Sequence, residues 1–362
     1  MSTYIYSSSP QIRSKRTTRQ VMAEVCIALV PACIAGCILL GWGALLQLAI
    51  ASISAVLAEF VYLLCCKKSF KEILDQFDFS SLVTGMLVGM NMYANSKWYV
   101  PMLASIFAIV VVKMLFGGTG KNIVNPAITG RIFAFISFGA EFGGTMYFVN
   151  ESGNASKVLS PITGGYIQGA TPLQALFGAQ TGGNTLTNLD LFLGTGVPGC
   201  IGETCKLALI IGGIYLVVRG ILNFRWPLVY ILTTGVVAVL LVWYDKCAAF
   251  AEANGSVNSV MVGEYFTQAW GSFLPSILSG GLILGAVFMA TDFVTTPNTK
   301  LGNYIYFVLL GIVTAVLRRA VKGEAVSFAI LLMNLLVPLI DKFILRKPFG
   351  YVRPQRVKKE AK

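Results

Sequence analysis

Residues 44–65 read ALLQLAIASISAVLAEFVYLLC, and this stretch decides the fold class. It matches the ~20 consecutive apolar residues that an α-helix needs to cross the hydrocarbon core of a bilayer. A single carboxyl, Glu59, interrupts it. Because a charged group inside a transmembrane helix is costly, Glu59 is a candidate functional residue from the outset.

Nine further apolar runs lie on either side of this stretch, at residues 22–41, 81–92, 100–116, 126–138, 206–218, 227–243, 274–290, 304–317 and 325–345. The chain is 56% hydrophobic and 12% charged, about half the charge of an ordinary soluble protein. We therefore expect an all-α polytopic membrane protein with about ten transmembrane helices. The first run is too long for the apolar core of a secretory signal, so we interpret it as a retained anchor.

Basic residues predict the orientation of the spans. They gather in the N-terminal arm, at 67–71, at 219–225 and in the tail from 346 to 359, and such clusters mark cytoplasmic loops. Both termini are then cytoplasmic, and the polar segment 141–202 is extracytoplasmic. The net charge of +12 is explained by this pattern, so we expect no nucleic-acid binding. Arg318 and Arg319 would face outward against this rule. If the count of ten spans is wrong, we expect the error to be a re-entrant hairpin near this pair.

Five spans on each side of the polar segment predict a five-plus-five inverted repeat. Residues 81–87 read SLVTGML and residues 276–282 read SILSGGL, each in the third span of its half. Two such segments running in opposite directions are typical of inverted-topology repeats. The predicted domains are a cytoplasmic arm (1–20), a first five-helix repeat (21–140), an extracytoplasmic segment (141–203), a second repeat (204–345) and a cytoplasmic tail (346–362).

The chain has eight cysteines and no histidine. The cysteines show no metal-binding spacing, so we predict no metal site and interpret most of them as small packing residues. A pore-lining or cluster-ligating role for Cys200 or Cys205 is the alternative. No residue is predicted to be catalytic.

Three polar stretches are candidate ligand sites. QGATPL at 168–173 presents the Thr171 hydroxyl beside Gly169 and Ala170, although a turn with Thr171 as a helix cap explains the same pattern. GGTGKNIVNPA at 117–127 contains Asn125 and lacks the spacing of a phosphate-binding loop, so a packed turn is an equal alternative. Residues 290–300 bring Asp292, Thr295 and Thr296, whose oxygens suit a hard cation or the polar edge of a bound ring, or cap the next helix.

Polar side chains within or beside the spans complete the candidates. Asn334 lies in the middle of a span and must find a hydrogen-bond partner there. Glu59, Asp78 and Glu203 are the predicted ion-pathway residues. Solvation at the membrane border explains Asp78 and Glu203 equally well, and only Glu59 resists that explanation.

Together these motifs resemble one family. GGTGKNIVNPA (117–127), GATPL (169–173), IGET (201–204), ATDFVTTP (290–297) and VSFAILLMNLLVPLID (326–341) look like the D subunit of the Rnf electron-transport complex (RnfD), which is related to the B subunit of the sodium-translocating NADH:quinone reductase. The resemblance covers nearly the whole chain and implies a urea-transporter-like fold. It departs from the family pattern at Gly165 and Gln168, where an Asp and a Ser or Thr are usual.

The resemblance implies the cofactors and the reaction. Thr171 would carry FMN through a phosphoester bond that a flavin transferase installs from FAD. A second, non-covalent flavin such as riboflavin is also implied, and Asn125, Asp292, Thr295 and Thr296 are our candidates for its pocket. The chain would be one subunit of a redox-driven translocase that couples ferredoxin and NAD to Na+ or H+ movement, and would be inactive alone.

The implied partners are the membrane subunits A, E and G and the cytoplasmic subunits B and C, in a bacterial or archaeal cell membrane. Two other functions remain open at this point. One is a channel or transporter for a small polar solute, and the other is a scaffold for neighbouring subunits. A flavin on Thr171 would distinguish an electron carrier from both.

Overall fold

The computed structural model describes residues 16–139, 146–149, 165–168, 187–194, 197, 199–254, 259–321 and 325–345. Its first half contains α1 (Thr18–Leu40), α2 (Trp42–Cys65), α3 (Phe70–Gln76), α4 (Ser80–Met90), α5 (Tyr99–Phe107), the π-helix η1 (Ala108–Met114) and α6 (Pro126–Ser137). The strands β1 (Met146–Val149) and β2 (Gly165–Gln168) follow and pair in antiparallel register, with Met146 opposite Gln168.

The second half is also helical. It comprises α8 (Asn188–Leu193), the 3-10 turn η2 (Ile201–Glu203), α9 (Lys206–Val218), α10 (Arg225–Asn254), α11 (Ser259–Trp270), α12 (Phe273–Leu278), α13 (Leu282–Leu284), the π-helix η3 (Gly285–Met289), α14 (Lys300–Val321) and α15 (Val326–Phe343). Each of the ten apolar runs that the sequence predicted is helical over most of its length, so the prediction of a helical multi-pass membrane protein is confirmed.

Helix length separates two kinds of span. Among the described residues, five helices are long and apolar enough to cross a membrane: Thr18–Leu40, Trp42–Cys65, Arg225–Glu252, Lys300–Val321 and Val326–Phe343. The apolar helices α4, α6 and α9 are shorter. The 12 residues of α6 extend only ~18 Å, which is less than the ~30 Å of hydrocarbon. Such helices are tolerated only where protein surrounds their ends, and α4 is accordingly buried on most sides.

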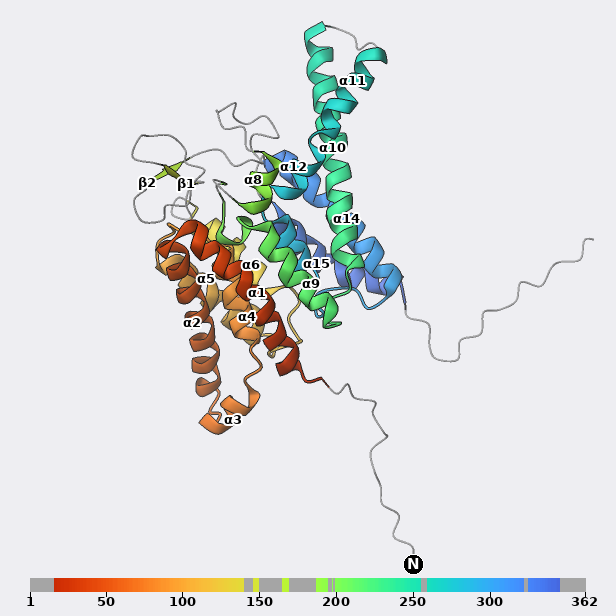
Figure 1. The fold of residues 1–362 in the computed structure, drawn as a ribbon. Helices are drawn as coiled ribbons and strands as arrows, with labels where there is room; N and C mark the ends of the chain where they lie inside the picture. Colours follow the sequence, from red (N-terminus) through yellow and green to blue (C-terminus); the bar gives the residue numbers. More distant parts are fainter. Residues whose placement is uncertain are drawn as a thin grey trace, which may run out of the picture.

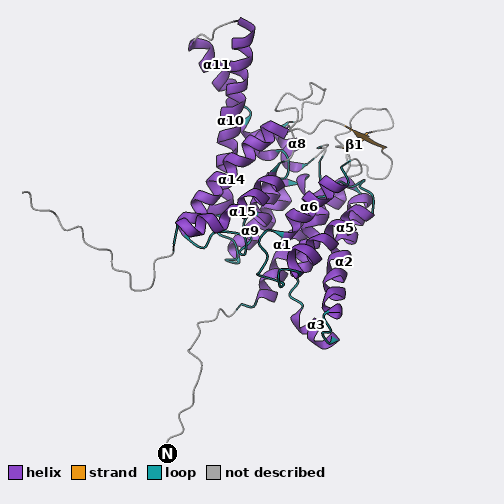
Figure 2. Cartoon of the chain, turned by 180° about the vertical axis from the view of Figure 1, so that it is seen from behind, coloured by secondary structure: helices purple, strands orange, loops and turns teal. Residues whose placement is uncertain are grey.

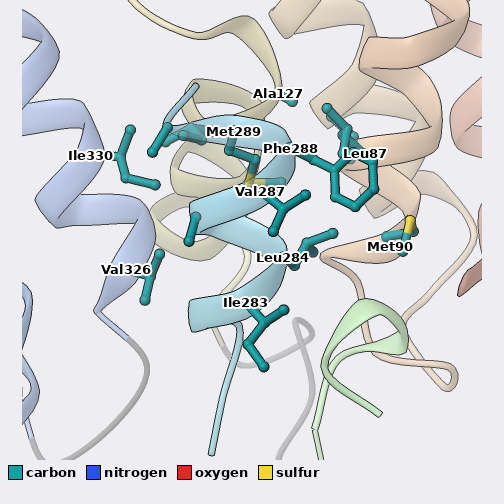
Figure 3. Close-up of a cluster of buried hydrophobic side chains, with 14 of the residues drawn as sticks. Leu87, Met90, Ala127, Ile283, Leu284, Val287, Phe288, Met289, Val326 and Ile330 are labelled. Atoms are coloured by element: carbon teal, nitrogen blue, oxygen red, sulfur yellow. The ribbon is translucent and has the colours of Figure 1, made fainter. Parts of the chain in front are cut away.

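The core lies where the two halves of the chain meet. Figure 3 shows Leu87 and Met90 of α4 facing Leu284 and Phe288, with Ile330 of α15 on the opposite side of η3. Close helix contacts hold the halves together. A Cβ added to Gly212 of α9 would lie 2.2 Å from the carbonyl oxygen of Ala28 in α1, so only glycine permits this approach of the two backbones.

The two ends of the molecule differ. The start of α1 and α3 lie at one end, and β1, β2, α8 and α11 lie at the other (Figure 1). The view from behind shows the same separation (Figure 2). At the second end α10 continues past the bundle, and α11 folds back along it. Trp243 of α10 donates to the carbonyl of Val262 (3.1 Å) and its ring meets Phe266 edge-on, which stiffens this hairpin.

Burial at a helix break accommodates Arg318, one residue of the basic pair that the sequence placed on the outer side. The helix α14 runs continuously through Arg318 and Arg319, and the interruption lies instead between α12 and α13. Arg318 is 2% exposed and donates to the carbonyl oxygens of Ser276 (2.9 Å) and Ser279 (3.2 Å) at the end of α12. Its guanidinium therefore satisfies carbonyl groups that the broken helix leaves without intrahelical partners. Arg319 pairs with Asp245 at the surface.

Replacement of Arg318 tests this capping role. We expect Arg318→Met to lower the free energy of unfolding by ~2–4 kcal/mol, because two buried carbonyl groups lose a charged donor. The control is Arg319→Met, which removes a half-exposed ion pair and should cost less than ~1 kcal/mol. Denaturant titration of the purified protein in detergent measures both. Equal costs for the two variants would contradict the assignment.

Candidate functional site

A pocket opens at the end of the bundle where α1 begins. It encloses about 880 Å³, including the space open to solvent at its mouth. Its walls come from α1, α4, the loop after η1, the end of α9 and the segment from η3 to residue 294. The apolar lining includes Val25, Val83, Leu87, Leu216 and Phe288, and the polar lining includes Ser80, Thr84, Lys113, Thr119, Asn122, Asn125, Thr291 and Asp292. Apolar walls with a few converging polar groups are typical of a site for an organic ligand.

Asn125 joins the pocket to the centre of the bundle. Its side-chain oxygen accepts from the N–H of Ala127 (3.0 Å) and caps α6, which begins at Pro126. Its amide nitrogen donates to the carbonyl of Met289 (3.1 Å), the last residue of η3. One side chain thus fixes both the start of α6 and the end of η3.

Asn334 finds the partners that the sequence required. With its amide oxygen toward the backbone N–H of Asn125 (3.2 Å), its nitrogen donates to the hydroxyl of Tyr306 (2.8 Å) and to the carbonyl of Ile330 (3.3 Å). The amide is 1% exposed. The prediction of an internally satisfied Asn334 is confirmed, and it places α15 directly against the start of α6.

The residues predicted at 292–296 are divided between the pocket and its surroundings. Asp292 lines the pocket and is half-buried, and burial raises the pKa of its carboxyl above the ordinary value. Thr296 donates to the carbonyl of Asp292 (3.0 Å) and stabilises the turn. Thr295 is buried beside the pocket, outside its lining, and its hydroxyl oxygen has no hydrogen-bond partner among the described residues.

Glu59 and Asp78 belong to one buried polar network. Lys113 of η1 donates to Glu59 of α2 (2.8 Å) and to the hydroxyl of Ser80 (2.6 Å), and Ser80 in turn contacts both Asp78 and Thr119. Lys113 is 2% exposed, and Lys113, Ser80 and Thr119 also line the pocket. The network therefore connects a carboxylate in the bundle, Glu59 with its side chain 12% exposed, to the pocket wall.

Hydrogen bonds lower the pKa of Asp78 in this network. Burial acts to raise the pKa of Asp78, but hydrogen bonds from Ser80 and Thr119 and the positive charge of Lys113 outweigh it. The pKa of Asp78 is consequently below its ordinary value. The second oxygen of Glu59, Oε2, is buried without a hydrogen-bond partner among the described residues.

Glu203 lies in a second polar network at the other end of the bundle. Arg131 of α6 pairs with its Oε1 atom (3.3 Å), and donates to Asn91 (2.9 Å), Ser327 (3.0 Å) and the sulfur of Cys200 (3.6 Å). Glu203 is 5% exposed. The alternative interpretation of Glu203, that it is solvated at the membrane border, is therefore wrong. Cys200 serves as a hydrogen-bond partner here, and no group of metal-ligating side chains occurs among the described residues.

Sequence reasoning missed the two basic residues that organise these networks. Lys113 lies within the apolar run 100–116 and Arg131 within 126–138, so a search for any charge inside a predicted span would have found both. Gly169, Ala170 and Thr171 lie outside the described residues, directly after β2 in the sequence. Their predicted role stays a prediction.

Comparison with known proteins identifies the family. The model of the NQR2, RnfD, RnfE family matches residues 5–350. The chain is 37% identical to the D subunit of the Na+-translocating ferredoxin:NAD+ oxidoreductase complex of Acetobacterium woodii, over 98% of the chain and 97% of that protein. It is 33% identical to the D subunit of the proton-translocating complex of Clostridium ljungdahlii (96% of each chain), and 31% identical to the D subunit of the ion-translocating oxidoreductase complex of Stutzerimonas stutzeri (91% and 92%). The chain belongs to the NQR2, RnfD, RnfE family.

The pair of Lys113 and Glu59 is open to a stability test. We expect Lys113→Met to lower the free energy of unfolding by ~3–5 kcal/mol, because Glu59 is left buried without its counter-charge. The double variant Lys113→Met, Glu59→Gln should recover most of that loss, since no unpaired buried charge remains. Denaturant titration of the three proteins in detergent gives the comparison. A double variant as unstable as Lys113→Met would refute the pairing.

Proposed function

We propose that this chain is a membrane subunit of an ion-translocating ferredoxin:NAD+ oxidoreductase complex in a bacterial or archaeal cell membrane. The observation that carries the proposal is similarity over almost the whole chain to three proteins named as the D subunit of such complexes. The complex would contain the membrane subunits A, E and G and the cytoplasmic subunits B and C. The pocket, at the end where α1 begins, would lie on the cytoplasmic side, and both termini would be cytoplasmic.

The ten helices form two inverted repeats in this proposal, with an architecture like that of urea transporters. Matching contacts in the two halves support it. In the first half, Glu59 of α2, the second predicted span, pairs with Lys113 of η1 at the end of the fourth span. In the second half, Asp245 of α10, the second span of that half, pairs with Arg319 at the end of α14, its fourth span. Inverted repeats place equivalent residues at equivalent positions of oppositely oriented halves.

Thr171 carries covalent FMN in this proposal. The flavin transferase forms an ester bond between the Thr171 hydroxyl oxygen and the phosphate of FMN, breaks the pyrophosphate bond of FAD, and releases AMP. The sequence supports this role, because Gly169 and Ala170 leave the hydroxyl unhindered and Pro172 fixes the backbone after it. Thr171 follows β2 by three residues in the sequence, and β2 lies at the end of the molecule opposite the pocket.

A second, non-covalent flavin occupies the pocket in this proposal. The lining fits a flat ring with one polar edge. Val25, Leu87 and Phe288 offer apolar walls, and Asn122 and Asn125 add amides to the lining. Asp292 and Lys113 provide an acceptor and a positive charge. A bound flavin supplies one- and two-electron redox chemistry, and these residues would hold its ring, set its polarity and exclude water.

Ion movement involves Glu59, Asp78 and Glu203 in this proposal. Glu59 and Asp78 share Lys113 and Ser80 with the pocket wall. A charge that changes in the pocket would therefore act on Lys113 at short range in a medium of low dielectric constant. That arrangement provides a physical link between the redox state of a pocket ligand and a buried carboxylate.

Mass spectrometry and flavin extraction test the two flavin sites separately. The complex co-expressed with the flavin transferase should carry an FMN mass on the peptide containing Thr171, and Thr171→Ala should lose it while keeping an acid-extractable flavin. Val25→Trp narrows the pocket and should lose the extractable flavin while keeping the covalent one. Its control is Ile27→Trp, on the exposed side of the same helix. An unmodified Thr171 in the assembled complex would refute the electron-carrier role.

The role of Glu59 is tested by comparing two rates. In proteoliposomes of the complex, we expect Glu59→Gln to reduce Na+ or H+ uptake more strongly than ferredoxin-dependent NAD+ reduction. The reason is that the substitution removes a charge from the network without changing the shape of the side chain. Ile53→Ala, on the exposed side of the same helix, is the control. Equal reduction of both rates, or of neither, would contradict a specific role in ion movement.

A further inference from the structure

Residues 199–204 (GCIGET) form a short segment that enters the bundle from the end carrying β1 and β2; we call it the outer plug. Cys200, Ile201, Glu203 and Thr204 are each at most 5% exposed. The plug is not a membrane-crossing helix, since its regular structure is the three-residue turn η2. Irregular backbone at this depth requires protein partners for its polar groups.

Both halves of the chain grip the outer plug. The backbone N–H of Ile201 donates to the carbonyl of Met92 (3.0 Å), just after α4. The side chain of Ile201 fits against Gly36 of α1, where an added Cβ would lie 2.7 Å from it. Gly202 is wedged between Met90 of the first half and Leu284 of the second. The plug thus fills the junction between the two halves.

Arg131 connects the outer plug to the surrounding helices. Its guanidinium contacts Glu203 and Cys200 of the plug, and at the same time Asn91 near the end of α4 and Ser327 of α15. The planar fork of arginine suits several directed hydrogen bonds at once. A single side chain therefore ties the plug to α4, α6 and α15.

The outer plug lies in line with the pocket. Leu87 of α4 and Phe288 of η3 line the pocket, while Met90 and Leu284 contact Gly202 of the plug. Figure 3 shows these four side chains facing one another across the core. Leu87 and Met90 are separated by about one helical turn, ~5 Å, and so are Leu284 and Phe288. The pocket and the plug are therefore the two ends of one axis between the halves, and a thin apolar layer divides them.

We propose that the outer plug is a seal against passive ion flow along this axis, and that the contact between Arg131 and Glu203 locks it. The proposal rests on the membrane orientation and the ion-translocating role proposed above. With the lock broken, the plug moves outward, and only the apolar layer of Leu87, Met90, Leu284 and Phe288 separates the pocket from the outer solution. Arg131 is a positioning residue in this device, since it acts through the plug.

Passive ion flux tests the seal without any redox turnover. The purified complex is reconstituted into liposomes loaded with ²²Na+ or a pH-sensitive dye, and leakage is followed without ferredoxin or NAD+. We expect Glu203→Gln and Arg131→Gln to raise the leak by ~10-fold or more, since a lost charge-assisted hydrogen bond shifts the population of the open plug by at least that factor. Arg131→Lys keeps the charge and should leak less than Arg131→Gln.

Two glycine variants provide a matched pair with no change of charge. Gly36→Ala pushes on Ile201 of the plug with a contact of 2.7 Å, and should increase the leak. Gly235→Ala in α10 creates a contact of the same 2.7 Å with Phe273, away from the plug, and should leave the leak unchanged. Equal leaks from these two variants would attribute the effect to general loosening and overturn the proposal.

Cys200 supplies a direct reading of plug position. In a complex with Cys205→Ser and Cys247→Ser, a membrane-impermeant maleimide applied from outside should label Cys200 slowly, and at least ~10-fold faster with Glu203→Gln, by the same population shift. Flavin content and size-exclusion profile establish that each variant is assembled. Assembled variants with unchanged leak and unchanged labelling would refute the seal. This assay needs no turnover, so a complex without coupled activity would contradict the proposed function and leave the seal still measurable.

Discussion

The structure depends on one constraint: where a helix is interrupted inside the bilayer, no water is present to bind its open backbone groups. Inside a bilayer, each carbonyl or N–H that a broken helix leaves open must find a partner within the protein. The chain meets this requirement with side chains from distant segments. Arg318 binds the carbonyls at the end of α12, and Asn125 binds the carbonyl of Met289 at the end of η3. Because these partners come from other helices, the breaks also determine how the helices pack.

The same requirement explains why the polar residues of the bundle occur in networks. A lone lysine or arginine in hydrocarbon is too costly. Lys113 accordingly meets a carboxylate and the Ser80 hydroxyl, and Arg131 meets a carboxylate and three neutral side chains. The two networks lie at opposite ends of the axis between the halves. The one around Lys113 borders the pocket, and the one around Arg131 borders the outer plug. The charged groups of these two networks thereby lie at the two ends of the axis, and the side chains of Leu87, Met90, Leu284 and Phe288 lie between them.

The sequence predicted the helices far better than their polar contacts. Ten apolar runs correspond to helices because hydropathy is a local property, and the need of Asn334 for a partner also followed from its position alone. Which side chain meets which is not local. The pairing of Lys113 with Glu59 depends on the packing of α2 against η1, and the burial of Arg318 depends on a break in another helix. The burial of Glu203 could not be predicted from the sequence for the same reason, because it depends on the insertion of its segment between the two halves.

The hairpin of α10 and α11 limits how other molecules can approach the face that carries β1 and β2. The 30 residues of α10 extend ~45 Å, so roughly 15 Å stands beyond a bilayer core of ~30 Å. Ring contacts such as Phe250 with Tyr265 tie α11 to it and make the projection rigid. It therefore acts as a fence along one edge of that face. A soluble domain that visits the face must arrive from the open side, and the arc through which a tethered domain can swing ends at α10.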